Sequence, residues 1–155
     1  GAEKFLDIKC VSADLNPDAV VIVATIRALK YHGGADLKEL TTPNVDAVSK
    51  GLENLEKHIE NIKSFNIEPV VAINKFVSDT DAEIEAIKAR CASLGVEVSV
   101  AEVWAKGGAG AEDLATKVAK AAEANTTAFK PQYKPEDSIA EKLKPLLKIF
   151  MVLMV

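Results

Sequence analysis

The chain has 155 residues, a formal net charge of −4 at pH 7 and a hydrophobic fraction of 48%. This length favours a single domain, and the composition is typical of a globular chain. Acidic and basic residues are mixed along the sequence, so there is no basic stripe for phosphate contacts. Aromatic residues are also few, and nucleic acid is therefore excluded as the main partner.

Isolated cysteines and histidines limit the chemistry that we expect. Cys10 and Cys91 lie far apart and match no C-x-x-C pattern, which indicates free thiols and a reducing, cytoplasmic location. His32 and His58 have no ligating neighbours in the sequence, so we predict no metal site. The charged N-terminus is unlike a secretory signal. The apolar run at residues 146–155 is shorter than the about 20 residues that a membrane span needs, so we predict no membrane partner.

Three apolar runs predict β-strands, at residues 18–25, 69–76 and 96–104. The first two runs are continuous, which is typical of strands that are buried on both faces. The third alternates more between apolar and polar residues, so we expect it to have one wetter face.

Amphipathic segments predict helices at residues 41–65, 81–94, 112–124 and 138–150. In the first of these, apolar residues recur at steps of three and four. The second follows a run of capping residues and closes at Gly95. Pro145 is expected to break or bend the last helix.

Strands that alternate with helices predict an α/β fold, a partial doubly wound parallel sheet with helices on both faces. In such sheets, ligands bind beyond the carboxyl ends of the strands. Three predicted loops meet at that edge, at residues 25–34, 74–79 and 104–110. Functional residues are therefore expected in these loops.

Asn74 and Lys75 directly follow the second apolar run. An Asn-Lys pair at a strand end is able to hydrogen-bond a purine edge and to pack along its ring, as in the Asn-Lys-x-Asp motif of many GTPases. Here Val77 occupies the position of the acid, and Asp79 comes two residues later. The alternative interpretation is a polar strand end that faces water.

The glycine-rich loop at residues 106–110 is able to cradle a phosphate at a helix start. Glu112 and Asp113, in the first turn of the following helix, would repel that phosphate. A flexible turn is the alternative interpretation, and Lys106 remains able to meet an anion from the side.

Arg27, Lys30 and His32 make the loop after the first strand basic, which suits an anionic ligand. The alternative is a solvated helical turn.

Trp104 is able to stack on a flat ligand, and the alternative is a core-edge residue with a satisfied N–H. No G-x-x-x-x-G-K-[ST] phosphate loop occurs in the sequence. Together these features indicate part of a nucleotide site without its phosphate loop.

Several long stretches in the same order resemble the formate–tetrahydrofolate ligase (formyltetrahydrofolate synthetase) family: GAEKFLDIKC, ATIRALKYHGG, GLENLEKHIENIK, VVAINKFVSDTDAEI and WAKGGAGAEDLA. The resemblance runs from Gly1 to about Lys144. It implies a domain similar to the P-loop ATPases and a reaction in which ATP drives the joining of formate to tetrahydrofolate through formyl phosphate. The implied substrates are ATP with Mg²⁺, formate and tetrahydrofolate, the implied product is 10-formyltetrahydrofolate, and the full enzyme is expected to be a homo-oligomer.

By matching position, the resemblance implies a set of residues that bind the nucleotide and formyl phosphate: Arg27, His32, Asn74, Lys75, Phe76, Trp104, Lys106, Gly107 and Gly108. The strand-end residues 74–76 are expected to form the floor of the site, and Lys106 with its glycines the neighbouring rim. The catalytic residues are not identified.

In the family, the phosphate loop lies upstream of the position that matches Gly1, and folate-stacking aromatic residues lie downstream of the position that matches Val155. We therefore expect an internal fragment of the catalytic domain, inactive on its own and with no ligand bound. Two alternatives stay open. One is a free-standing nucleotide-binding module, and the other is a folded remnant without a ligand that self-associates through its apolar tail.

The end of the chain departs from the family. After SIAEKLK the family pattern resembles Thr-Ile-Ala-Lys-Asp-Ile-Tyr-Gly-Ala-Asp-Gly, whereas this chain reads PLLKIFMVLMV. One coding string gives both sequences in two reading frames, so we hypothesise a one-nucleotide deletion near the codon of Lys144. Residues 1–144 would then be the α/β domain, and residues 145–155 an aberrant apolar tail. We expect this tail to be disordered or buried against another molecule, and to be prone to aggregation.

Overall fold

The structure is a computed structural model that describes residues 1–126 and 129–150. Its centre is a parallel sheet with the strand order β1-β2-β3, which confirms the predicted α/β class. The strands are β1 (Val20–Ala24), β2 (Pro69–Asn74) and β3 (Val98–Ala101).

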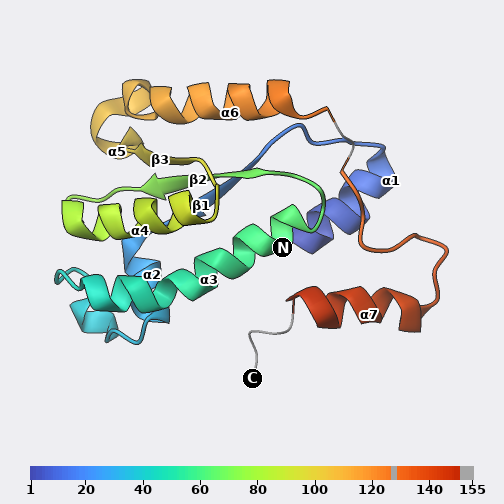
Figure 1. Cartoon of the computed structure of the whole chain (residues 1–155), viewed down its shortest axis with the longest axis horizontal. Coiled ribbons are helices and arrows are strands. Elements are labelled where there is room, and N and C mark those ends of the chain that lie inside the picture. Colours follow the sequence, from blue (N-terminus) through green and yellow to red (C-terminus); the bar gives the residue numbers. More distant parts are fainter. Residues whose placement is uncertain (127–128, 151–155) are drawn as a thin grey trace.

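Helices cover both faces of the sheet (Figure 1). Helix α6 lies over β2 and β3 on one face, α3 and α4 lie on the other, and α2 packs against α3. The helical elements are η1 (Lys4–Cys10), α1 (Val11–Ala13), α2 (Ile26–His32), η2 (Leu37–Glu39), α3 (Val45–Lys63), α4 (Asp81–Ser93), α5 (Val103–Lys106), η3 (Gly107–Ala111), α6 (Glu112–Ala124) and α7 (Ile139–Phe150).

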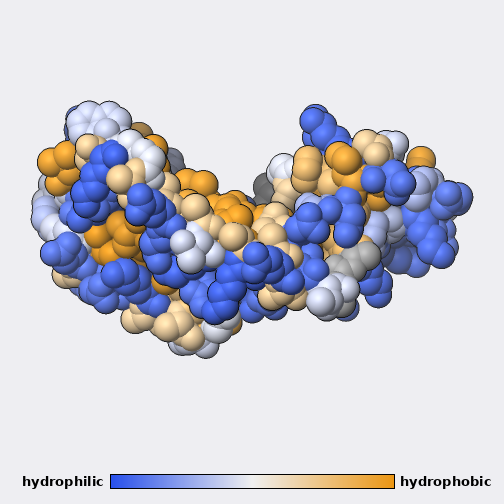
Figure 2. Space-filling model, turned by 90° about the horizontal axis from the view of Figure 1, so that it is seen from above, coloured by the Kyte–Doolittle hydropathy of each residue, from blue (hydrophilic) through white to orange (hydrophobic). Residues whose placement is uncertain are grey.

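The burial of β2 agrees with its continuous apolar sequence, because residues 69–73 are all buried between two neighbouring strands. β1 differs. Val21 and Val23 are 37% and 65% exposed, so the prediction that this strand is buried on both faces is wrong. The reason is that β1 is an edge strand and α6 lies over the other two strands. Seen from above, the molecule is hollowed between its two ends, and apolar residues line part of the hollow (Figure 2).

Side-chain caps set the starts of α3 and α4. Asn44 accepts a hydrogen bond from the Ala47 N–H (2.9 Å), so α3 starts later than the predicted residue 41. At α4, Thr80 and Glu83 form a reciprocal capping box, which confirms the predicted start of this helix.

The segment at residues 25–34 contains helix α2 and is not the predicted loop. α2 packs closely on α3. A Cβ atom on Gly33 would lie 1.8 Å from the Ala47 carbonyl oxygen, and one on Gly51 would lie 1.9 Å from the Leu29 carbonyl oxygen. Two glycines therefore bring the two backbones into contact, and this tertiary packing supports a helix that is too short to be stable alone.

The third strand is shorter than predicted because the chain turns after Ala101. The Glu102 N–H donates to the Gly110 carbonyl oxygen (2.9 Å), and the intervening residues fold back as α5 and η3. A Cβ on Gly110 would lie only 2.5 Å from the Glu102 carbonyl oxygen, so this close return needs glycine. Trp104 therefore lies on a short helix and not at a strand end.

An N-terminal helix, η1 followed by α1, has no clear signal in the amino-acid pattern. It buries Leu6 and Cys10 in a small core with Phe65, while Phe5 and Ile8 stay exposed. Because apolar residues face both the core and the solvent, the helical periodicity is blurred. Both cysteines of the chain are free, as predicted.

Helix α7 continues through Pro145, so this proline does not break the helix. Ile139, Leu143 and Leu147 are largely exposed, and Figure 1 shows α7 apart from the sheet and its covering helices. The rest of the predicted tail, residues 151–155, lies outside the described residues. Within the part that the structure describes, no helix has the length and apolarity to cross a membrane.

Candidate functional site

Arg27, in the first turn of α2, contacts the connection between β2 and α4. Its guanidinium carbon lies 4.9 Å from the centre of the Phe76 ring, which is a cation–π arrangement. Its Nη2 donates to the Ser78 hydroxyl at 3.4 Å. Its Nε is buried and has no hydrogen-bond partner among the described residues. Because an unpaired buried donor costs free energy, this N–H needs an acceptor that the described residues do not supply.

The connection itself is held in a tight turn by Asp79. The Phe76 N–H donates to Asp79 Oδ2 (2.8 Å), and the Asp79 N–H donates to the Phe76 carbonyl oxygen (3.0 Å). Asp79 is buried, whereas Val77 between them is 88% exposed. Asp79 is the acidic residue that follows the Asn-Lys pair, two positions after the guanine-reading position of the GTPase motif. Its carboxylate already accepts the Phe76 N–H, and this arrangement does not favour guanine recognition.

Two candidate cations share one carboxylate at the neighbouring strand end. Lys75 Nζ lies 3.9 Å from Glu102 Oε1, and Lys106 Nζ lies 2.5 Å from Glu102 Oε2. Lys75 Nζ also lies 3.8 Å from Asp81 Oδ1. The hydrogen bond from Lys106, together with the charges of both lysines, outweighs desolvation and holds the pKa of Glu102 below its usual range. Both ammonium groups are therefore held at the end of the sheet, each in partial contact with solvent.

Strand pairing brings these loops to one edge. Asn74 pairs with Ala101 across the carboxyl ends of β2 and β3, and the Lys75 N–H donates to the Ala101 carbonyl oxygen (3.1 Å). Ala24, the last residue of β1, pairs with Ile73, so α2 begins at the same edge. Arg27 therefore contacts Phe76, and Lys75 and Lys106 both lie beside the carboxylate of Glu102. Their role in ligand binding stays a prediction.

The remaining candidates are arranged differently. His32, at the end of α2, lines a cavity of about 170 Å³ beside β1 together with His58. Trp104 is 80% exposed, so the interpretation as a core-edge residue is wrong. Gly107 has a φ of 59°, which favours glycine in the turn between α5 and η3. A Cβ on Gly108 would meet no atom within 4 Å, so its surroundings leave room for a side chain.

Lys30 is not available to a ligand, which corrects its interpretation as part of a basic loop. It is fully buried and its Nζ lies 2.6 Å from Glu83 Oε1. The sequence did not indicate three residues that contact the candidate site residues or Lys30: Glu102, Ser78 and Glu83. For Glu83 a signal exists, because the Thr80-x-x-Glu83 spacing is that of a capping box. The i,i+4 spacing of Glu102 and Lys106 is a sequence signal for their ion pair, whereas no pattern indicates that Lys75 also lies near Glu102.

A parallel α/β sheet with helices on both faces belongs to the doubly wound class, in which ligands bind beyond the carboxyl ends of the strands. A family model of formate–tetrahydrofolate ligase matches residues 1–150. The chain therefore belongs to the formate–tetrahydrofolate ligase family, which confirms the resemblance and gives the reaction class as ligation of formate to tetrahydrofolate. The matched range runs past Lys144, and the boundary of the predicted tail stays a prediction.

Proposed function

We propose that this chain forms one wall of the nucleotide and formyl phosphate site of a formate–tetrahydrofolate ligase. Two observations on Arg27 carry the proposal: its guanidinium lies over the Phe76 ring, and its buried Nε has no acceptor among the residues that the structure describes. A guanidinium held in one plane is suited to phosphoryl oxygens, because its donors form a rigid fork.

In this reaction a formate oxygen attacks the terminal phosphorus of ATP and ADP leaves. A tetrahydrofolate nitrogen then attacks the formyl carbon, and inorganic phosphate leaves. Arg27 would stabilise the negative charge that is shared among the phosphoryl oxygens, since a fixed donor needs no reorganisation during the transfer. Phe76 and Ser78 would keep the guanidinium in place.

Lys75 and Lys106 would hold the phosphate chain from the side of β3. Both are engaged by Glu102, so a ligand phosphate must compete with this carboxylate. ATP carries several negative charges and Glu102 carries one, and the Coulomb attraction therefore favours the nucleotide. Asn74, the last residue of β2, would offer an amide to the base or the ribose.

Mg²⁺ would enter as part of the ATP substrate. Within residues 1–126 and 129–150, no group of three or more His, Cys, Asp and Glu side chains is placed to hold a metal ion. The described residues therefore do not fit a resident metal, and we assign no step to one.

We also propose that the 155-residue chain has no ligase activity on its own. The sequence contains no G-x-x-x-x-G-K-[ST] motif. Without the backbone N–H groups of such a loop, Arg27, Lys75 and Lys106 would be the main phosphate donors, and we expect ATP to bind weakly.

The test is a titration of the purified chain with ATP and Mg²⁺, followed by an assay for formyltetrahydrofolate in the presence of formate and tetrahydrofolate. We expect millimolar ATP binding that Arg27→Ala weakens, and no product. Micromolar ATP binding with product formation would overturn the proposed inactivity. ATP binding that is unchanged in Arg27→Ala would overturn the proposed wall of the site. If Arg27→Ala leaves the affinity for ATP unchanged and a substitution of Asn74 lowers it, the result would favour a free-standing nucleotide-binding module.

A further inference from the structure

Helix α2 is attached to the connection between β2 and α4 at two points. Arg27 and Lys30 lie three residues apart on α2, which places them on one side of the helix. Arg27 contacts Phe76 and Ser78 at the start of the connection. Lys30 contacts Glu83 in the first turn of α4, where the connection ends.

The ion pair between Lys30 and Glu83 is fully buried, and both partners are 0% exposed. Lys30 Nζ lies 2.6 Å from Glu83 Oε1 and also donates to the carbonyl oxygens of Leu40 (3.3 Å) and Thr42 (2.9 Å). An ammonium group has three N–H donors. Every donor of Lys30 therefore has a partner, and none is left for a ligand.

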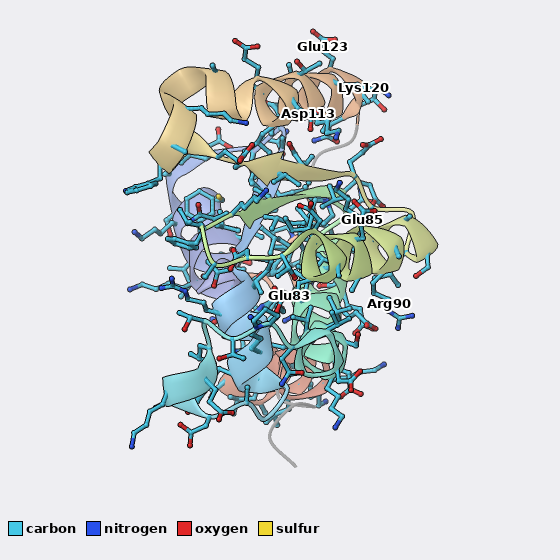
Figure 3. The ribbon with its side chains drawn as sticks, turned by 90° about the vertical axis from the view of Figure 1, so that its left-hand side faces the viewer. Glu83, Glu85, Arg90, Asp113, Lys120 and Glu123 are labelled. Atoms are coloured by element: carbon cyan, nitrogen blue, oxygen red, sulfur yellow. The ribbon has the colours of Figure 1, made fainter. Side chains whose placement is uncertain are left out.

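Glu83 is equally well satisfied. Its Oε1 also accepts from the Asn44 N–H (2.8 Å), and its Oε2 accepts from the N–H and the hydroxyl of Thr80 (3.0 and 2.8 Å). Figure 3 shows Glu83 turned inward from α4, whereas Glu85 and Arg90 project outward. One carboxylate thus joins α2, the start of α3 and the residue that precedes α4.

This network adjoins the turn that holds Arg27. Thr80, which Glu83 binds twice, directly follows Asp79, and Asp79 closes the turn onto the Phe76 N–H (2.8 Å). Phe76 carries the ring beneath the Arg27 guanidinium. A shift of Thr80 would therefore be passed through Asp79 to Phe76 and would open the contact with Arg27.

We propose that Lys30 and Glu83 are positioning residues for the ligase site. Their buried ion pair fixes the connection at residues 76–80, so that Phe76 and Ser78 hold the guanidinium of Arg27. The importance of this role for the reaction rests on the proposed function, but the geometric claim does not.

A structural role in stability alone is the competing explanation. Replacing both partners of a buried ion pair by apolar residues of similar volume is often neutral, because desolvation offsets the attraction, whereas removing the charge of one partner alone is destabilising. The chain offers a matched comparison in Arg90 and Glu56, which form a bidentate pair between α4 and α3 (both distances 2.6 Å) at the surface. This pair contacts neither Phe76 nor Arg27.

The test uses the ¹⁵N-labelled 155-residue chain and the Nε–Hε signal of Arg27, which we expect the Phe76 ring to displace from the position of a free arginine. We compare the wild type with the double variant Lys30→Met/Glu83→Gln, which keeps the shapes of both side chains and removes both charges. Glu56→Gln is the control. We expect the ring-induced displacement to be lost in the double variant and kept in Glu56→Gln.

A folded double variant that keeps the wild-type Arg27 signal would overturn the proposal, and so would an equal change in Glu56→Gln. If the double variant does not fold, hydrogen exchange of the wild type decides. The Arg27 Nε–H and the Asn44 and Thr80 amides should then open together as one local unit. An Arg27 signal that exchanges while both amides stay protected would contradict the proposal. Since no ligand is used, failure of this test and failure of ATP binding are separate results.

Discussion

Glu102 is the residue whose charge most directly limits the candidate site, because it accepts from Lys106 and lies near Lys75. We predict that Glu102→Gln strengthens the binding of ATP or tripolyphosphate severalfold, since both ammonium groups lose a competing carboxylate. The expected direction follows from Coulomb attraction and should be largest at low salt.

The measurement is an isothermal or NMR titration of the wild type and Glu102→Gln at two salt concentrations. Glu60→Gln is a suitable control, because it removes one acidic charge from an exposed pair with Lys57 on α3. Equal affinities for the wild type and Glu102→Gln, or a weaker variant, would show that these lysines do not bind the anion.

At the scale of elements, the contact between α2 and α3 depends on Gly51. An alanine is favoured by about 1 kcal/mol in a helix interior. However, its Cβ would lie 1.9 Å from the Leu29 carbonyl oxygen, and backbone cannot yield as a side chain does. We expect Gly51→Ala to lower the free energy of unfolding by about 2 kcal/mol or more, as overpacking does.

Urea unfolding followed by circular dichroism measures this loss. Gly108→Ala is the matched control, since its Cβ would meet nothing within 4 Å and we expect a change below about 0.5 kcal/mol. A Gly51→Ala variant as stable as Gly108→Ala would mean that the two helices pack less closely than described. A change in α2 would also displace Arg27, so ATP binding should weaken together with stability.

The buried pair between α2 and α4 predicts a pH dependence. Burial alone would raise the pKa of Glu83, but hydrogen bonds from Lys30, Asn44 and Thr80 outweigh it and lower the pKa from 4.5 to about 2. The folded pKa is therefore below the unfolded value. Ionised Glu83 stabilises the fold above pH 4.5, and we expect a contribution on the order of 3 kcal/mol to be lost as the pH falls to about 2.

Unfolding free energies of the wild type and Glu83→Gln between pH 2 and 6 isolate this contribution. The difference between the two proteins should shrink as the pH falls. Asp7 acts in the opposite sense, because burial raises its pKa despite a hydrogen bond from Gln132. It is present in both proteins and cancels in the comparison. A difference that is constant with pH would contradict the assigned state of Glu83.

At the scale of the whole molecule, we propose that residues 145–150, the described part of the predicted tail, lie outside the packed α/β domain. Leu147 is 52% exposed, and α7 lies apart from the sheet (Figure 1). Removing residues 145–155 should change the unfolding free energy by less than about 0.5 kcal/mol. If the chain self-associates through this tail, the removal should also abolish that association, which size-exclusion chromatography and sedimentation measure. A strongly destabilised shortened chain would show that this segment packs on the domain, and the proposed tail would be wrong.

Much of the fold could be predicted from local patterns. Continuous apolar residues located β2, the capping residues before α4 located the start of that helix, and the alternation of strands and helices predicted the parallel sheet. These features depend on neighbouring residues only. The exposed face of β1 could not be predicted, because a run such as VVIVA does not say which helices lie over it.

The location of the candidate site could be predicted from the sequence, but most of the contacts between its side chains could not. The edge followed from strand direction. Helix α2 was missed because its support is the glycine contact with α3, which joins residues far apart in the sequence. For the same reason the sequence does not reveal that Lys30 is buried in an ion pair. Its partner, Glu83, lies on another helix, and only the folded chain brings the two together.

The most direct test of the site is an NMR titration of the ¹⁵N-labelled chain with ATP and Mg²⁺. We predict that the largest amide shift changes occur at Asn74, Lys75, Phe76 and Lys106, and that the Arg27 Nε–Hε signal moves with them. The contradicting result is a set of changes at the cavity of about 500 Å³ beneath α6, which Lys117 and Lys120 help to line, with the carboxyl edge of the sheet undisturbed.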